Sequence, residues 1–173
     1  LGLIGLQDPL RPEVPQAIRR CQEAGVKVVM MTGDYPETAL KIGQQAGIRS
    51  TGPVISGSEV NTLSDEALVS RLSGAAIFAR VIPDQKLRIV KALKSMGHVV
   101  GMTGDGVNDA PSLKWADVGI AMGGRGTDVA REASDIVLLD DNIASIVAGI
   151  ERGRIIFNSI RKAMSFIFAV HVP

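Results

Sequence analysis

Residues 99–111 read Val-Val-Gly-Met-Thr-Gly-Asp-Gly-Val-Asn-Asp-Ala-Pro, an apolar run followed by a glycine-rich turn. The turn carries two carboxylates, Asp105 and Asp109, between an expected buried strand and an expected helix. Gly104 and Gly106 let the backbone bend sharply and approach a ligand closely. Amides at the start of a helix favour an anion, and paired carboxylates favour a hard cation such as Mg²⁺. The stretch therefore predicts a site for phosphate and magnesium.

Around this turn, short apolar runs alternate with longer helical patterns, which predicts an α/β fold: a Rossmann-like parallel sheet flanked by helices. The more polar segment 49–73 reads as an insertion with a short helix, and the loop 123–126 reads as a flexible connector. The expected strands are 3–6, 26–31, 75–79, 98–102, 118–121 and 136–139, and the expected helices are 12–24, 36–46, 84–95, 110–115 and 128–133.

The composition is that of one ordinary globular domain. The 173 residues are 46% hydrophobic and 21% charged, enough for a single α/β domain with a real core. A net charge of +1 and 3% aromatic residues give no reason to expect nucleic acid as a partner. Cys21 is the only cysteine, which excludes an intrachain disulfide or a cysteine metal cluster and favours a reducing, cytoplasmic environment.

The C-terminal end has a different pattern. A long helix is expected from Asn142, and its basic residues precede the apolar stretch 164–172. A basic cluster before an apolar run is typical of a cytoplasmic membrane boundary, and an amphipathic core helix is the alternative. We expect a domain over 1–150 and, over 151–173, a stalk helix leading into a truncated membrane helix. Because Leu1 is not a methionine, the chain is expected to be a piece of a longer protein.

Polar residues follow four of the expected strands, at the edge where parallel sheets place their ligands. Thr32-Gly33-Asp34 offers a hydroxyl and two amides for a phosphoryl group, and Lys86 offers an ammonium to neutralise its charge. The Asp105–Asp109 turn offers metal ligands, and Asp8-Pro-Leu-Arg11 ends the first expected strand. Alone, the first is a common capped turn and Lys86 a common solvated position. In this order and spacing, together they favour phosphoryl transfer.

Five runs carry a closer comparison: Asp8-Pro-Leu-Arg11, Met31-Thr-Gly-Asp34, Phe78-Ala-Arg80 with Pro83 and Lys86, Thr103-Gly-Asp-Gly-Val-Asn-Asp-Ala-Pro111 and Gly126-Thr-Asp-Val-Ala130. They resemble the phosphorylation domain of P-type cation-transporting ATPases, which belongs to the haloacid dehalogenase-like superfamily. The resemblance covers nearly the whole chain. It is closer to calcium-type and sodium/potassium-type pumps than to heavy-metal pumps.

The resemblance implies that Asp105 binds Mg²⁺, with Asp109 as its partner or as a supporting carboxylate. It also implies that Asn108 orients the phosphoryl group or its attacking water. The residues that it places on phosphoryl oxygens are Thr32, Gly33 and Lys86, and those that it places on the nucleotide are Arg11, Asp34 and Arg80, supported by Asp8.

The resemblance further implies ATP and Mg²⁺ as cofactors, and a position on the cytoplasmic side of a plasma or inner membrane. The implied partners are the nucleotide-binding, actuator and membrane parts of the same pump, together with the transported cation. The tail Ala169-Val-His-Val-Pro173 resembles bacterial calcium-type pumps. Pumps choose their ion with groups inside the membrane, so this sequence does not name it.

One part of the family's machinery is missing from the sequence. The family's nucleophile is an aspartate in an Asp-Lys-Thr-Gly-Thr motif, and no such run occurs in the 173 residues. Asp8 is no substitute, because Pro9 follows it where the family has lysine. The absent segment also carries a central strand. We therefore expect a gap in the sheet, self-association through it, and neither ATP hydrolysis nor a phosphoenzyme from this chain alone.

Two alternative functions remain open at this point. A soluble phosphatase of the same superfamily would carry its own nucleophile, and the basic-then-apolar tail would have no purpose there. A non-catalytic module that binds a phospho-ligand fits the missing nucleophile, but it would not need Lys86, Asp105 and Asp109 together. The pump is the favoured function.

Overall fold

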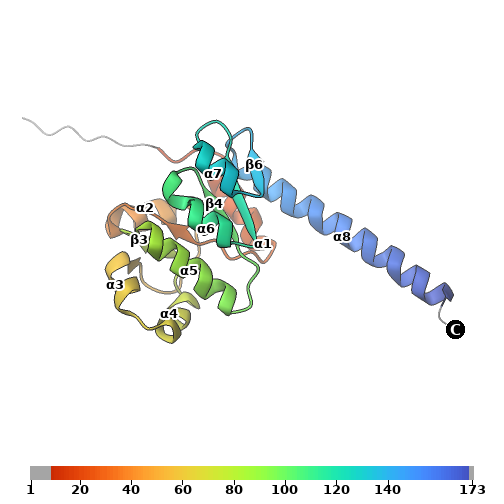
Figure 1. Ribbon diagram of the computed structural model, residues 1–173, viewed down its shortest axis with the longest axis horizontal. Coiled ribbons are helices and arrows are strands. Elements are labelled where there is room, and N and C mark those ends of the chain that lie inside the picture. Colours follow the sequence, from red (N-terminus) through yellow and green to blue (C-terminus); the bar gives the residue numbers. More distant parts are fainter. Residues whose placement is uncertain (1–8, 172–173) are drawn as a thin grey trace, which may run out of the picture. The chain divides into compact units, whose positions relative to one another are not determined.

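The computed structural model describes residues 9–171, with side chains described to residue 169, and it has an α/β architecture (Figure 1). The expected strand at 3–6 and the carboxylate of Asp8 lie outside the described residues. The chain divides into two units between Asp141 and Asn142, and each is described by itself.

All strand pairs in the first unit are parallel, and they form two separate sheets. In one, β3 (Ile77–Ala79) lies between β1 (Met30–Met31) and β2 (Ile55–Ser56), with Phe78 in register with both Met31 and Ile55. In the other, β5 (Val118–Met122) lies between β4 (Gly101–Gly104) and β6 (Ile136–Leu138). The predicted parallel α/β fold is confirmed.

Each sheet has open edges among the residues that the structure describes. There β1 and β2 each pair only with β3, and β4 and β6 each pair only with β5. The expectation of a further strand supplied from outside this chain remains a prediction, and such a strand would pair with one of these edge strands.

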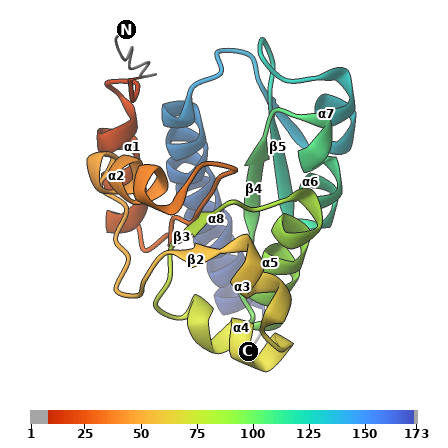
Figure 2. The same ribbon diagram turned by 90° about the vertical axis from the view of Figure 1, so that its left-hand side faces the viewer.

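Helices cover the sheets, and their ends follow local sequence signals. Pro36 starts α2 and Gly47, at φ +76°, ends it. Figure 2 shows α1 and α2 on the side of the first sheet, and α6 and α7 along β4 and β5. The helices of the first unit are α1 (Val14–Glu23), α2 (Pro36–Ala46), α3 (Gly57–Thr62), α4 (Asp65–Leu72), α5 (Pro83–Ser95), the 3₁₀ turn η1 (Val107–Asp109), α6 (Ala110–Trp115) and α7 (Asp128–Ala133).

The segment 49–73 is more structured than the sequence predicted. It contains β2 and two helices, whereas one short helix was expected, so that prediction was wrong. A serine N-cap precedes each helix: the Ser56 hydroxyl accepts the Glu59 N–H, and the Ser64 hydroxyl accepts the Ala67 N–H. These N-caps stabilise helices too short and polar to show a clear apolar period.

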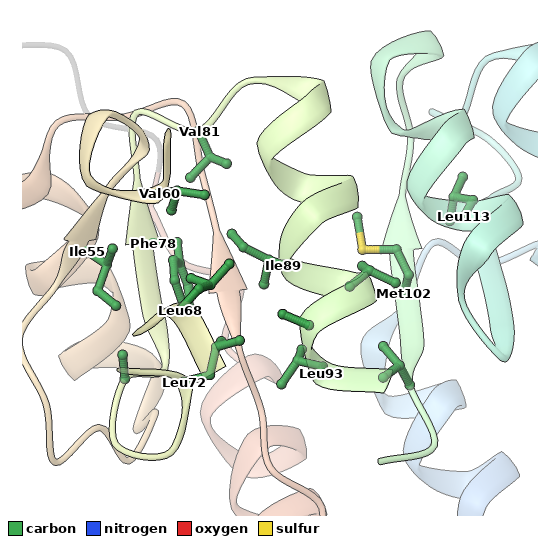
Figure 3. Packing of buried hydrophobic residues seen from close by; sticks show 14 of the residues in the cluster. Ile55, Val60, Leu68, Leu72, Phe78, Val81, Ile89, Leu93, Met102 and Leu113 are labelled. Carbon is green, nitrogen blue, oxygen red and sulfur yellow. The ribbon is translucent and has the colours of Figure 1, made fainter. Parts of the chain in front are cut away.

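One hydrophobic core contacts both sheets, and α5 runs through it. Ile89 of α5 is fully buried, as is Phe78 of β3, and both share a cluster with Met102 of β4. Figure 3 shows Ile89 and Leu93 on α5, with Phe78 toward one side and Met102 toward the other. Burying a side chain of this size stabilises a fold by roughly 1.5–3 kcal/mol. The helix therefore fixes the two sheets against one another.

The second unit is the long helix α8 (Ile143–His171). Its first turn is capped, because the Asn142 side-chain oxygen accepts the Ala144 N–H at 2.9 Å. No helix within residues 9–171 combines the length and apolar character needed to cross a membrane. The unit starts ahead of residue 151, where the sequence placed the stalk, and the stalk role itself remains a prediction.

Candidate active site

An ion pair between Lys86 and Asp109 lies at the centre of the site. Lys86 is on the first turn of α5, which follows β3, and Asp109 ends η1, which follows β4. Lys86 Nζ lies 2.7 Å from Asp109 Oδ1, and the side chains are 19% and 9% exposed. The other carboxylate oxygen accepts the Gly106 N–H at 3.4 Å. This charge-assisted hydrogen bond therefore joins the carboxyl ends of the two sheets.

Gly104 gives Asp109 the space that it occupies. A Cβ at Gly104 would lie 2.5 Å from the Asp109 Cβ, closer than side chains pack. The sequence assigned this glycine to close approach of a ligand. In the structure, a carboxylate of the same turn makes the close approach.

Thr32 and Asp34 form a compact loop at the end of β1. The Thr32 hydroxyl donates to Asp34 Oδ2 at 3.0 Å and accepts the Asp34 N–H at 3.1 Å. The carbonyls of the same two residues accept N–H groups from Arg80 and Val81, each at 3.0 Å. A Cβ at Gly33 would meet nothing within 4 Å, so the middle of this loop is open to a ligand.

Arg80 lies against that loop. Its backbone has φ +54°, a left-handed conformation that is uncommon for a residue with a side chain. Its guanidinium Nη1 donates to the Gly33 carbonyl at 3.4 Å, and the guanidinium carbon lies 4.5 Å from the centre of the Tyr35 ring. Sequence reasoning missed Tyr35. The available signal was an aromatic residue between Thr32-Gly33-Asp34 and Pro36.

Asp105 borders a second, anchored loop. Its backbone carbonyl accepts the Thr127 N–H at 2.8 Å. The carboxylate of Asp141 accepts the N–H groups of Gly124 and Arg125 at 3.0 and 2.9 Å. The Gly124 hydrogen bond, with that of Arg125, outweighs desolvation and lowers the pKa of Asp141. The loop 123–126 is therefore anchored by the Asp141 carboxylate, and its flexibility remains a prediction.

The predicted site residues fall into two groups, and the contacts lie within each group. Thr32, Gly33, Asp34 and Arg80 form one group, and Lys86 with Asp109 forms another. Arg11 lies apart from these contacts: its Nη1 donates to the Asp141 carbonyl at 2.9 Å, on the side of the loop 123–126. Asn108 and Asp105 are exposed.

The donor set fits a magnesium ion of the kind that also takes phosphate and water ligands. In the described chain, the Asp105 carboxylate makes no side-chain hydrogen bond or ion pair, so its oxygens are available. Asp109 already uses one oxygen on Lys86. No group of three or more His, Cys, Asp or Glu ligands gathers within residues 9–171. Mg²⁺ bound through one or two carboxylates plus phosphate and water does not require one.

Comparison with known proteins agrees with this geometry. The sequence model of the haloacid dehalogenase-like hydrolases matches residues 1–117. The chain belongs to the haloacid dehalogenase-like hydrolases. It matches, over nearly its whole length, the haloacid dehalogenase-like phosphorylation domain of P-type cation-transporting ATPases.

The relatives of this haloacid dehalogenase-like chain are cation pumps. It is 55% identical over 168 residues to calcium-transporting ATPase 1 of Yarrowia lipolytica, covering 95% of this chain and 18% of the relative. It is 51% identical over 173 residues to the calcium-transporting ATPase of Bacillus subtilis, covering 99% and 19%. The crystal structure of a zinc-transporting PIB-type ATPase in its E2.Pi state aligns with TM-score 0.69 and 33% identity, over 90% of this chain and 21% of that one. The chain thus spans about a fifth of the length of the curated relatives that it matches.

Proposed function

We propose that this chain works as the phosphorylation domain of an ATP-driven cation pump that forms an aspartyl phosphate. The observation that carries the proposal is the Lys86–Asp109 ion pair across the ends of the two sheets, with the free Asp105 carboxylate in the same turn as Asp109. Phosphoryl transfer needs little covalent help from a protein. It needs positioned charge, which this arrangement supplies.

Each residue has a distinct task in this proposal. Asp105 holds Mg²⁺, which neutralises phosphate charge when bound, and Asp109 supports it while fixing the Lys86 ammonium. Asn108 orients the phosphoryl group or the attacking water. Thr32 and Gly33 hold phosphoryl oxygens together with Lys86, because their loop presents an open surface there. The residues assigned to the nucleotide are Arg11, Asp34 and Arg80.

The proposal requires parts that these 173 residues do not contain. The nucleophilic aspartate comes from another segment of the same pump, as do the nucleotide-binding, actuator and membrane parts. The domain then lies on the cytoplasmic side of a membrane. We propose Ca²⁺ as the transported cation, because the two relatives described above are calcium-transporting ATPases.

The decisive experiment labels the full-length protein in membranes with γ-³²P-ATP over a panel of cations. An acid-stable, hydroxylamine-sensitive phosphoprotein that responds to Ca²⁺ supports the proposal, and Asp105→Asn and Lys86→Ala should abolish it. A response to a different cation corrects the ion alone. The absence of labelling with any ion refutes the pump.

The same preparations separate the two alternatives. Hydrolysis of p-nitrophenyl phosphate without cation dependence would indicate a soluble phosphatase. Mg²⁺ or phosphate binding without turnover, lost in Asp105→Ala, would indicate a non-catalytic module. We expect the 173-residue chain alone to form no phosphoenzyme.

A further inference from the structure

Tyr35 contacts the site loop but has no task in the function proposed above. Tyr35 is 63% exposed, so it contributes little to the core. The Arg80 guanidinium carbon lies 4.5 Å from the ring centre, within the range of a cation–π contact. The aromatic side chain therefore lies against Arg80, an arginine that also contacts the Thr32-Gly33-Asp34 loop.

The backbone fixes both members of this pair. Tyr35 precedes Pro36, which restricts it to the extended conformation that it adopts at φ −65° and ψ 151°. The preceding carbonyl, that of Asp34, accepts the Arg80 N–H at 3.0 Å. Arg80 itself is held at φ +54°. The ring and the guanidinium are thus brought together by the same connection between the ends of β1 and β3.

Stacking leaves the guanidinium able to bind an anion. An aromatic ring covers the flat face of an arginine, while the N–H donors at its edge remain directed outward. Nη1 donates to the Gly33 carbonyl at 3.4 Å. In the described part of the chain, the other guanidinium N–H groups of Arg80 have no protein partner. They are available to oxygens of a ligand.

We infer that Tyr35 is a positioning residue: its ring holds the Arg80 guanidinium at the edge of the site for the nucleotide. The identity of the ligand rests on the proposed function, whereas the stacking rests on the geometry. Because the contact uses the ring face, Phe should replace Tyr35, and an aliphatic residue of similar size should not.

The first test measures ATP-dependent activity of the full-length protein with Tyr35→Leu, Tyr35→Phe and Arg80→Ala. Tyr35→Leu should raise KM for ATP about two- to fivefold with kcat unchanged, the size of an exposed cation–π contact. Tyr35→Phe should behave as wild type. The double variant Tyr35→Leu/Arg80→Ala should be no worse than Arg80→Ala, because the ring acts through the arginine.

The chain offers a matched control. The Lys91 ammonium lies 4.4 Å from the centre of the Trp115 ring, so Trp115→Leu removes a second surface cation–π contact on another part of the domain. It should leave KM for ATP unchanged. An unchanged KM in Tyr35→Leu, or additive effects in the double variant, would overturn the inference while leaving the labelling results intact.

A second measurement does not depend on turnover. In NMR spectra of the 173-residue chain, the Arg80 Nε–H signal should be shifted by the ring in wild type and Tyr35→Phe, and it should lose that shift in Tyr35→Leu. An Arg80 signal that is insensitive to Tyr35→Leu refutes the inference, whether or not a phosphoenzyme forms.

Discussion

Lys86 Nζ lies 2.7 Å from Asp109 Oδ1, and this contact joins a residue that follows β3 to one that follows β4. Both side chains are largely out of water, so neither charge is well tolerated without the other. Asp109 therefore neutralises and positions the Lys86 ammonium directly. Asp105 is left as the carboxylate with both oxygens available.

The first prediction concerns this ion pair. Asp109→Ala should lower the free energy of unfolding of the chain by about 3 kcal/mol, because it leaves the Lys86 charge partly buried and unpaired. Urea unfolding followed by circular dichroism measures the loss.

Two controls make the result specific. Arg71→Ala removes the pair between Arg71 and Glu59, whose side chains are 43% and 44% exposed, and should cost less than about 1 kcal/mol. Lys86→Met/Asp109→Leu should recover most of the stability, because it removes both charges and keeps the volume. Equal losses in Asp109→Ala and Arg71→Ala would contradict the prediction.

Two glycines near the site should respond differently to alanine. Gly104→Ala places a methyl group 2.5 Å from the Asp109 Cβ, so it should displace that side chain and destabilise the chain by about 1–3 kcal/mol. Gly33→Ala meets nothing within 4 Å and should unfold like wild type. In the full-length protein, however, Gly33→Ala should reduce phosphoenzyme formation. Matching unfolding curves for the two variants would show that Gly104 does not set the position of Asp109.

Acid should weaken the anchored loop through Asp141. Its pKa lies below the ordinary value of 3.8, chiefly because its carboxylate accepts the Gly124 N–H. A carboxyl group with a lowered folded-state pKa stabilises the fold above its unfolded pKa and loses that contribution as the pH falls through the folded value. The stability difference between wild type and Asp141→Asn should therefore be constant near neutral pH and shrink below about pH 4. A difference that is independent of pH down to the acid transition would rule this out.

The open edges of β1 and β4 predict self-association of the isolated chain. Unpaired strand edges are templates for pairing with a second copy. Sedimentation velocity over a range of concentrations should show reversible oligomers. A synthetic peptide containing the Asp-Lys-Thr-Gly-Thr segment of a calcium-type pump should reduce them. A monomer at every concentration would exclude association through these edges.

Much of the fold could be predicted because local signals mark it. The helix predicted over 36–46 has the same bounds as α2, because Pro36 marks its start and Gly47 its end. The strand expected at 26–31 is confined to Met30 and Met31, because register with β3 extends only that far. One short helix was expected within 49–73 and two are present, because serine caps rather than an apolar period define them.

The residues of the candidate site could be predicted from the sequence, but the contacts between them could not. Lys86 and Asp109 were both singled out, yet their pairing depends on where two sheets lie, which local sequence does not encode. Arg80 was expected on the nucleotide, but its stacking on Tyr35 depends on a left-handed backbone at Arg80. Such a backbone is usually marked in a sequence by glycine, and this position is an arginine. The roles of these residues in catalysis remain predictions.

The helix α5 is buried against both sheets, and its first turn carries Lys86. Ile89 and Leu93 lie farther along the same helix and pack in the core between the sheets. A shift of one sheet against the other would therefore move α5 and the Lys86 ammonium with it. A strand that pairs at an edge of either sheet and displaces that sheet would displace α5 as well. Its arrival would therefore reach the ammonium as a mechanical displacement of α5, through side-chain packing.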